Sequence, residues 1–74
     1  LKAGANVHHA NNDGNTALIE ASFHGHTSVV KLLLNAGANV NHANNNGDTP
    51  LMEASRYGKT NIVELLLNSG VDVN

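Results

Sequence analysis

Apolar residues recur along this chain with the spacing of short amphipathic helices. In residues 49–58, Leu51, Ala54 and Ser55 stand at i, i+3 and i+4, which predicts a helix with a narrow inward face of small side chains. Residues 60–70 hold a denser apolar run and predict a second helix with a wider apolar face that includes Leu66 and Leu67. Residues 16–25 and 27–37 carry the same two patterns, so the chain should contain two pairs of short helices.

Capping residues stand at both ends of the predicted helices. Thr49 can accept a hydrogen bond as an N-cap, and Pro50 suits the first helical position, where its missing N–H is harmless. Thr60 is predicted to cap the next helix in the same way. Gly58 and Gly70 follow the two helices, where a left-handed residue commonly ends a helix. The first copy has its equivalents at Thr16, Thr27, Gly25 and Gly37.

The chain repeats itself with a period of 33 residues. Aligning residues 1–41 with residues 34–74 gives 26 identical pairs out of 41. The predicted organisation is a tail of a preceding repeat with its hairpin (1–10), one repeat (11–43), and a second repeat that runs into the next hairpin (44–74). Because helices of about 8 to 10 residues are marginal alone, each pair must stack on its neighbour in a solenoid.

The segment Gly47–Ala54 and the run Ile62–Asn74, together with the 33-residue period, resemble the ankyrin repeat. The resemblance implies an all-α solenoid of antiparallel helix pairs joined by short β-hairpin-like loops. It also implies binding of a protein partner through the hairpin tips and the concave face of the inner helices. Carried over position by position, that surface comprises Asn12, Asp13, Asn15, Phe23, His24, Asn45, Asn46, Asp48, Arg56 and Tyr57.

The differences between the two copies favour the same surface. Framework positions are identical in the two copies, whereas Phe23 aligns with Arg56 and His24 aligns with Tyr57. Aromatic and Arg side chains are enriched at the centres of protein interfaces, although such positions can also simply be variable and solvent-exposed. We therefore expect a protein–protein interaction module. The alternative is a structural spacer in a longer ankyrin array whose activity lies elsewhere in the parent protein.

Composition narrows the range of partners. The 74 residues include six acidic and four basic side chains, a net charge of −2, which argues against nucleic acid and anionic membrane as the main ligand. There is no cysteine, and no apolar run approaches the roughly 20 residues that span a bilayer. We expect an intracellular protein, cytoplasmic or nuclear, with no cofactor and no small-molecule substrate.

The titratable residues do not form a recognisable reaction centre. Glu20 and Glu53 occupy equivalent positions, but a carboxylate pair on a solenoid has neither a pocket nor a nucleophile, so no enzyme activity is expected. Glu53 stands three residues before Arg56, which predicts a surface ion pair. His9 and His42 could approach each other across the repeats, yet no further ligand completes a metal site, and none is expected.

Two further expectations concern the repeat ends. The sequence that ends at Asn74 is similar to ankyrin sites that an iron- and 2-oxoglutarate-dependent asparaginyl hydroxylase modifies, so Asn74 is the predicted acceptor. Asn41 is a weaker equivalent. The alternative is that the Asn at this position only forms hydrogen bonds with the hairpin backbone.

Neither end of the chain looks like a polar cap, so we expect a fragment of a longer array that self-associates through its exposed ends.

Overall fold

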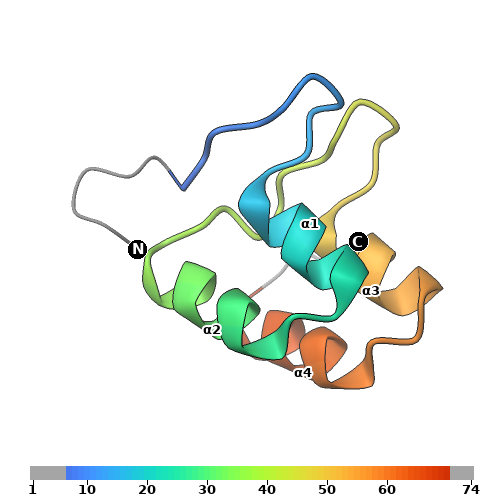
Figure 1. Ribbon diagram of the computed structural model, residues 1–74. Helices are drawn as coiled ribbons and strands as arrows, with labels where there is room; N and C mark the ends of the chain where they lie inside the picture. The colour runs from blue at the N-terminus through green and yellow to red at the C-terminus, as the bar shows by residue number, and fades with distance from the viewer. Residues whose placement is uncertain (1–6, 71–74) are drawn as a thin grey trace.

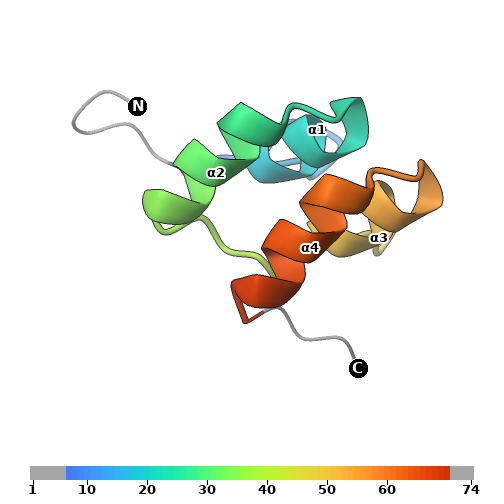
Figure 2. The ribbon, with the colours of Figure 1, turned by 90° about the horizontal axis from the view of Figure 1, so that it is seen from below.

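Two helical pairs stand side by side in the computed structural model, which describes residues 7–70. Helices α1 (Ala17–His24) and α2 (Thr27–Asn35) form the first pair, and α3 (Pro50–Arg56) and α4 (Thr60–Asn68) form the second. Helix α1 packs against α2 and α3, and α4 packs against α3 and α2 (Figures 1 and 2). Over residues 7–70 the β-structure consists of one isolated bridge between Ala10 and Thr16, so the predicted all-α class is confirmed.

The helix starts differ between α1 and α3, which we call the inner helices, and α2 and α4, which we call the outer helices. Thr16 and Thr49 cap α1 and α3 as predicted, each accepting a 3.3 Å hydrogen bond from the third residue of its helix. The prediction that Thr27 and Thr60 are N-caps is wrong, because both are already the first helical residue. The N-cap of α4 is Lys59, whose N–H donates to the carbonyl of Ala54 at 2.8 Å, and the His26 N–H bonds the carbonyl of Ala21 in the first copy. These backbone hydrogen bonds to the inner helix thus fix the residue before each threonine as the N-cap of the outer helix.

The predicted glycine positions are confirmed at all four helix ends. Each of these glycines has a positive φ, and they are Gly25, Gly37, Gly58 and Gly70. The longest helices in the described part of the chain have nine residues, and none there is long or apolar enough to cross a membrane.

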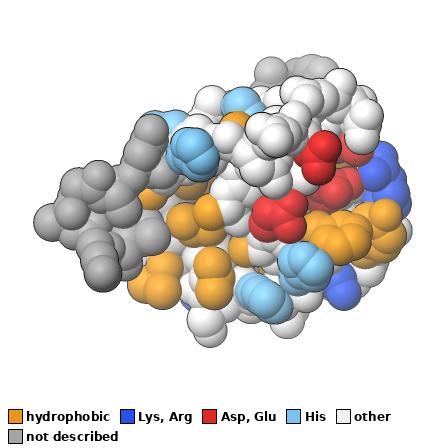
Figure 3. Space-filling view, turned by 45° about the horizontal axis from the view of Figure 1, so that its top comes forward, with side chains coloured by type: hydrophobic (Ala, Val, Ile, Leu, Met, Phe, Trp, Pro, Cys, Tyr) orange, Lys and Arg blue, Asp and Glu red, His pale blue; other side chains and the backbone are white. Residues whose placement is uncertain are grey.

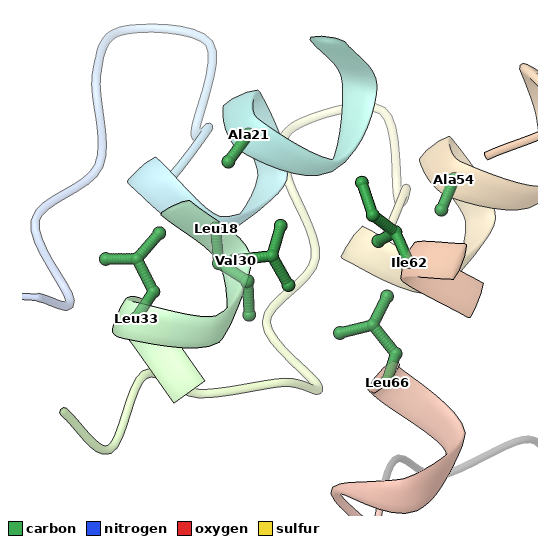
Figure 4. Packing of buried hydrophobic residues seen from close by; sticks show 7 residues of the cluster. All are labelled: Leu18, Ala21, Val30, Leu33, Ala54, Ile62 and Leu66. Atoms are coloured by element: carbon green, nitrogen blue, oxygen red, sulfur yellow. The ribbon is translucent and has the colours of Figure 1, made fainter. Parts of the chain in front are cut away.

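The hydrophobic core lies between the four helices. Its buried side chains come from both pairs and pack across the boundary between them (Figure 4); they are Leu18, Ala21, Val30, Leu33, Ala54, Ile62 and Leu66. The same core therefore holds each pair together and joins the two repeats.

Equivalent positions of the two repeats differ in burial, and the difference reveals the direction of stacking. Ile62 is 1% exposed, whereas its equivalent Val29 is 42% exposed. Ile19 is 1% exposed, whereas its equivalent Met52 is 48% exposed. A position covered in one repeat and open in the other must face along the stack. Val29 therefore lies on one end of the stack and Met52 on the other.

Two end faces can be defined on this basis. The first end face contains Val29 and Leu32, and the second contains Met52, Ser55 and Leu67. The prediction that Ser55 points inward is wrong, because Ser55 is exposed while its equivalent Ser22 is fully buried. Leu67, predicted on a wide buried face, is 48% exposed. The second repeat covers these positions of the first, and no described residue does so for the second.

Candidate partner-binding face

The two loops that precede the inner helices are built by the same side-chain bonds. The Oδ1 atom of Asn11 accepts hydrogen bonds from the N–H groups of Asp13 (2.9 Å) and Asn15 (3.0 Å). Asn44 Oδ1 accepts from Asn46 and Asp48 at 2.9 and 3.0 Å. Asn side chains commonly close such turns on the following backbone. Asn11 and Asn44 are not among the residues predicted from the sequence, but the recurrence of Asn at these two positions, 33 residues apart, is the signal that indicates them.

Hydrogen bonds also join the second loop to the first. The backbone N–H of Asn45 donates to the carbonyl of Asp13 (3.0 Å), and its Nδ2 donates to the carbonyl of Asn12 (2.9 Å). Asn44 Nδ2 donates to Asn15 Oδ1 at 2.8 Å. In every one of these bonds the later loop donates and the earlier loop accepts. Three of the predicted binding residues, Asn12, Asn15 and Asn45, thus hold the loops together.

A histidine adds a bond of the same direction. His42 Nε2 lies 3.0 Å from the carbonyl oxygen of Gly14 and donates to it, since a carbonyl only accepts. His42 was considered above as a partner of His9 in a metal site. Residues 7–70 contain no group of three or more His, Cys, Asp or Glu side chains that could hold a metal ion. His42 instead connects the repeats.

An exposed aromatic cluster crosses the boundary between the inner helices. The rings of Phe23 and Tyr57, which come from different repeats, lie 4.8 Å apart at 84°. The Phe23 ring also meets His24 edge-on at 4.7 Å. Such edge-to-face pairs are a favourable arrangement of aromatic rings. Phe23 is nonetheless 37% exposed and Tyr57 49% exposed, so three of the predicted binding residues form one solvent-facing surface.

Charged side chains surround this cluster. The predicted pair of Glu53 and Arg56 is confirmed, with Nη1 2.8 Å from Oε1. Both terminal nitrogens of Arg56 also donate hydrogen bonds to the Asp48 carboxylate, at 3.0 and 3.1 Å. The sequence did not predict this contact. This bond lowers the pKa of Asp48 and raises the pKa of Arg56. In the first repeat, Glu20 instead accepts from Asn15 Nδ2 at 2.9 Å.

The Arg56–Asp48 bond predicts a pH-dependent effect of Asp48→Asn. Because the folded-state pKa of Asp48 lies below its unfolded value of about 3.9, its carboxylate stabilises the fold fully above that value. The stabilisation is lost as the pH falls through the lowered folded-state pKa. Urea unfolding at pH 7 should find Asp48→Asn less stable than the unchanged chain, and this difference should disappear at low pH.

Asp13→Asn is the matched control for that measurement, because Asp13 is an exposed carboxylate at the tip of the other loop. It should show no comparable pH-dependent loss. A deficit of Asp48→Asn that is the same at pH 7 and at low pH would contradict the assignment to ionised Asp48.

Together these residues form what we call the aromatic–acidic face. It consists of the aromatic cluster and the flanking charges, namely Asp13, Glu20, Phe23, His24, Asp48, Glu53, Arg56 and Tyr57. Figure 3 shows acidic side chains gathered next to hydrophobic ones on one side of the molecule, with Lys or Arg beside them. Four carboxylates against one guanidinium make this face acidic.

The remaining predicted residues lie apart from the cluster. Asn46 is exposed at the second loop tip. Asn41, the weaker hydroxylation candidate, is exposed, and its N–H donates to Asn39 Oδ1 at 2.9 Å. Asn74 lies outside the described residues. Hydroxylation of either residue stays a prediction.

Comparison with known proteins places the chain in a family. No curated protein sequence matches it. The family model for ankyrin repeats (3 copies) matches residues 1–74, which is the whole chain. Ankyrin repeats are generally protein–protein interaction modules and are typically not enzymes. The four helices, the 33-residue period and this match agree, and the chain belongs to the ankyrin-repeat family.

Proposed function

We propose that this chain binds a protein partner through the aromatic–acidic face. The observation that carries the proposal is the contact between Phe23 and Tyr57, which are 37% and 49% exposed. Two large rings from different repeats fix each other's position while both remain open to solvent. Rigid exposed aromatic side chains with a charged surround are typical of the residues that dominate binding energy in protein interfaces.

The loops support this proposal through preorganisation. Asn11 and Asn44 fix the backbone within each loop, and Asn45 ties one loop to the other. A surface that is already ordered loses little conformational entropy when a partner docks on it. The loop tips therefore offer hydrogen bonds to a partner at a small ordering cost.

The charges indicate the chemistry of the partner. Arg56 is bound by Asp48 and Glu53, whereas the Glu20 side chain is 46% exposed and Asp13 is exposed. A partner that presents Lys or Arg next to an apolar side chain would complement both the carboxylates and the rings. We expect such segments to bind more tightly than acidic ones.

Selection from a displayed random-peptide library on the immobilised chain tests the proposal. Selected peptides should be enriched in Lys and Arg beside apolar residues. Phe23→Ala and Tyr57→Ala should each weaken their binding by about thirtyfold, which corresponds to about 2 kcal/mol for a central interface residue.

Leu32→Ala is the control, because Leu32 is a large exposed side chain on the first end face. It should leave peptide affinity unchanged. Peptides that bind Phe23→Ala and Tyr57→Ala as tightly as the unchanged chain would overturn the assignment of this face. Failure to select any peptide would favour a spacer, a role consistent with the use of Asn12, Asn15 and Asn45 in bonds between the loops.

A further inference from the structure

The contact between the two repeats is made from parts that recur at both ends of the molecule. On the side of the second repeat, the polar contacts come from His42, Asn44 and Asn45. Their equivalents 33 residues earlier are His9, Asn11 and Asn12, the same three residue types. The described first end of the stack thus carries a second copy of the donors that the repeat contact uses.

The acceptors recur in the same way. The first repeat accepts through the carbonyls of Asn12, Asp13 and Gly14 and through Asn15 Oδ1. The equivalent positions in the second repeat are 45–48. Three of these supply backbone carbonyls, whose chemistry does not depend on the side chain. The fourth is Asp48, whose carboxylate is also an acceptor.

Among the residues that the structure describes, none fills the space beside Gly47, one of these acceptor positions. A Cβ atom at Gly14 would come within 2.6 Å of Asn45 Oδ1, because the second loop packs directly on it. A Cβ atom at the equivalent Gly47 would have no heavy atom within 4 Å. The second loop therefore has room for a further loop where the first loop already has one.

The apolar side chains of the two end faces match each other as well. Val29 and Leu32 are 42% and 57% exposed, and their equivalents Ile62 and Leu65 pack in the contact between repeats. Met52 and Leu67 are both 48% exposed, and their equivalents Ile19 and Leu34 are covered. Each end face is a near copy of one half of an interface that the molecule already contains.

From this complementarity we infer that a second copy of this chain stacks on the first, head to tail, in the geometry of the internal repeat contact. The first end face of one molecule covers the second end face of the other. This contact goes beyond the partner binding proposed above: it shares the Asp48 carboxylate with the aromatic–acidic face but does not use the aromatic cluster. Because it joins two different faces, each added molecule leaves a new end face open, and the assembly does not close.

Sedimentation equilibrium of variants with one blocked end face tests the inference. Val29→Lys with Leu32→Lys blocks the first end face, and Met52→Lys with Leu67→Lys blocks the second. The average mass of the unchanged chain should rise with concentration beyond that of a dimer. Each blocked variant should associate at least about a hundredfold more weakly, since a charge buried without a partner strongly opposes contact.

An equimolar mixture of the two blocked variants distinguishes head-to-tail stacking from other modes. Each variant retains the face that the other lacks, so the mixture should form a one-to-one dimer of twice the 7.7 kDa mass of one chain. Self-association of either blocked variant alone would overturn the inference, because it requires contact between two identical faces. A mixture that stays monomeric, or an unchanged chain that stays monomeric at millimolar concentration, would overturn it too.

A control variant and a second test variant complete the experiment. Asn35→Lys with Asn68→Lys adds the same charge at equivalent positions that are exposed in both repeats, and it should associate like the unchanged chain. Asn12→Asp leaves the apolar faces intact but replaces an amide donor on the first end with an acceptor. It should weaken association about tenfold or more, in keeping with the loss of one buried hydrogen bond. Unaltered association of Asn12→Asp would contradict the stacking geometry.

Discussion

Replacing Leu66 with alanine should lower the free energy of unfolding by about 2 to 5 kcal/mol. Leu66 is fully buried in the core at the boundary between the two helical pairs. Truncation removes apolar contacts and leaves a cavity that neighbouring side chains fill only in part. A chain of 74 residues has a total stability of roughly 4 to 11 kcal/mol at typical values per residue, so this single change removes a large share of it. Urea unfolding followed by circular dichroism measures the loss.

Leu67→Ala is the matched control for this experiment. Leu67 is the next residue of the same helix and undergoes the same chemical change, so differences in helix propensity cancel. Its side chain is 48% exposed on the second end face. We expect a loss below about 1 kcal/mol for this variant at concentrations where the chain is monomeric. Equal losses for Leu66→Ala and Leu67→Ala would show that the buried core is not where we place it.

Replacing Gly14 with alanine should cost about 2 to 5 kcal/mol, from two separate causes. Gly14 has a φ of +79°, where a side chain costs about 1 to 2 kcal/mol. The new Cβ atom would also lie 2.6 Å from Asn45 Oδ1 and 2.8 Å from the backbone nitrogen of Asn45. The side-chain atom could rotate away, but the backbone atom moves only if the whole second loop shifts, and forced repacking costs about 1 to 3 kcal/mol.

Gly47→Ala separates these two causes. Gly47 has nearly the same φ, +83°, and no heavy atom within 4 Å of the added Cβ position. Its substitution should therefore carry only the backbone cost of about 1 to 2 kcal/mol. The difference between the two variants, measured by urea unfolding of monomeric samples, reports the close approach of the two loops. Identical losses would mean that the loops do not pack as described.

The period of the sequence predicted the helices because their start signals are local. Thr49 and Pro50 act within one turn, and both are used as expected. The N-caps of the outer helices lie one residue before the predicted threonines. A backbone hydrogen bond to the inner helix fixes Lys59 as the N-cap of α4, and a capping pattern in the sequence does not contain that bond. Ser55 was misplaced because periodicity shows which positions face inward but not whether a neighbouring repeat covers them.

The candidate site was predicted only as a set of exposed positions. The comparison of the two copies pointed to Phe23 and Tyr57, but not to their contact. The contact joins positions that are not equivalent, because the equivalent of Phe23 is Arg56 and that of Tyr57 is His24. The hydrogen bonds from Arg56 to Asp48 join residues eight positions apart. They have no counterpart in the first copy, where the equivalent residues are Phe23 and Asn15. Such a bond depends on how the loop folds back over the helix, which a single sequence does not reveal.

The one-way direction of the bonds between loops constrains how a gene for such a chain can change in length. The second loop donates to the first, and the three donor residue types of the second loop recur 33 positions earlier in the first. Loss or duplication of one whole period would again place donors opposite acceptors at the new junction. A deletion of another size within the helices or between a donor and its helix would move the donors away from their acceptors. Whole-period steps are therefore the length changes that this architecture tolerates, so descendants should differ by entire repeats.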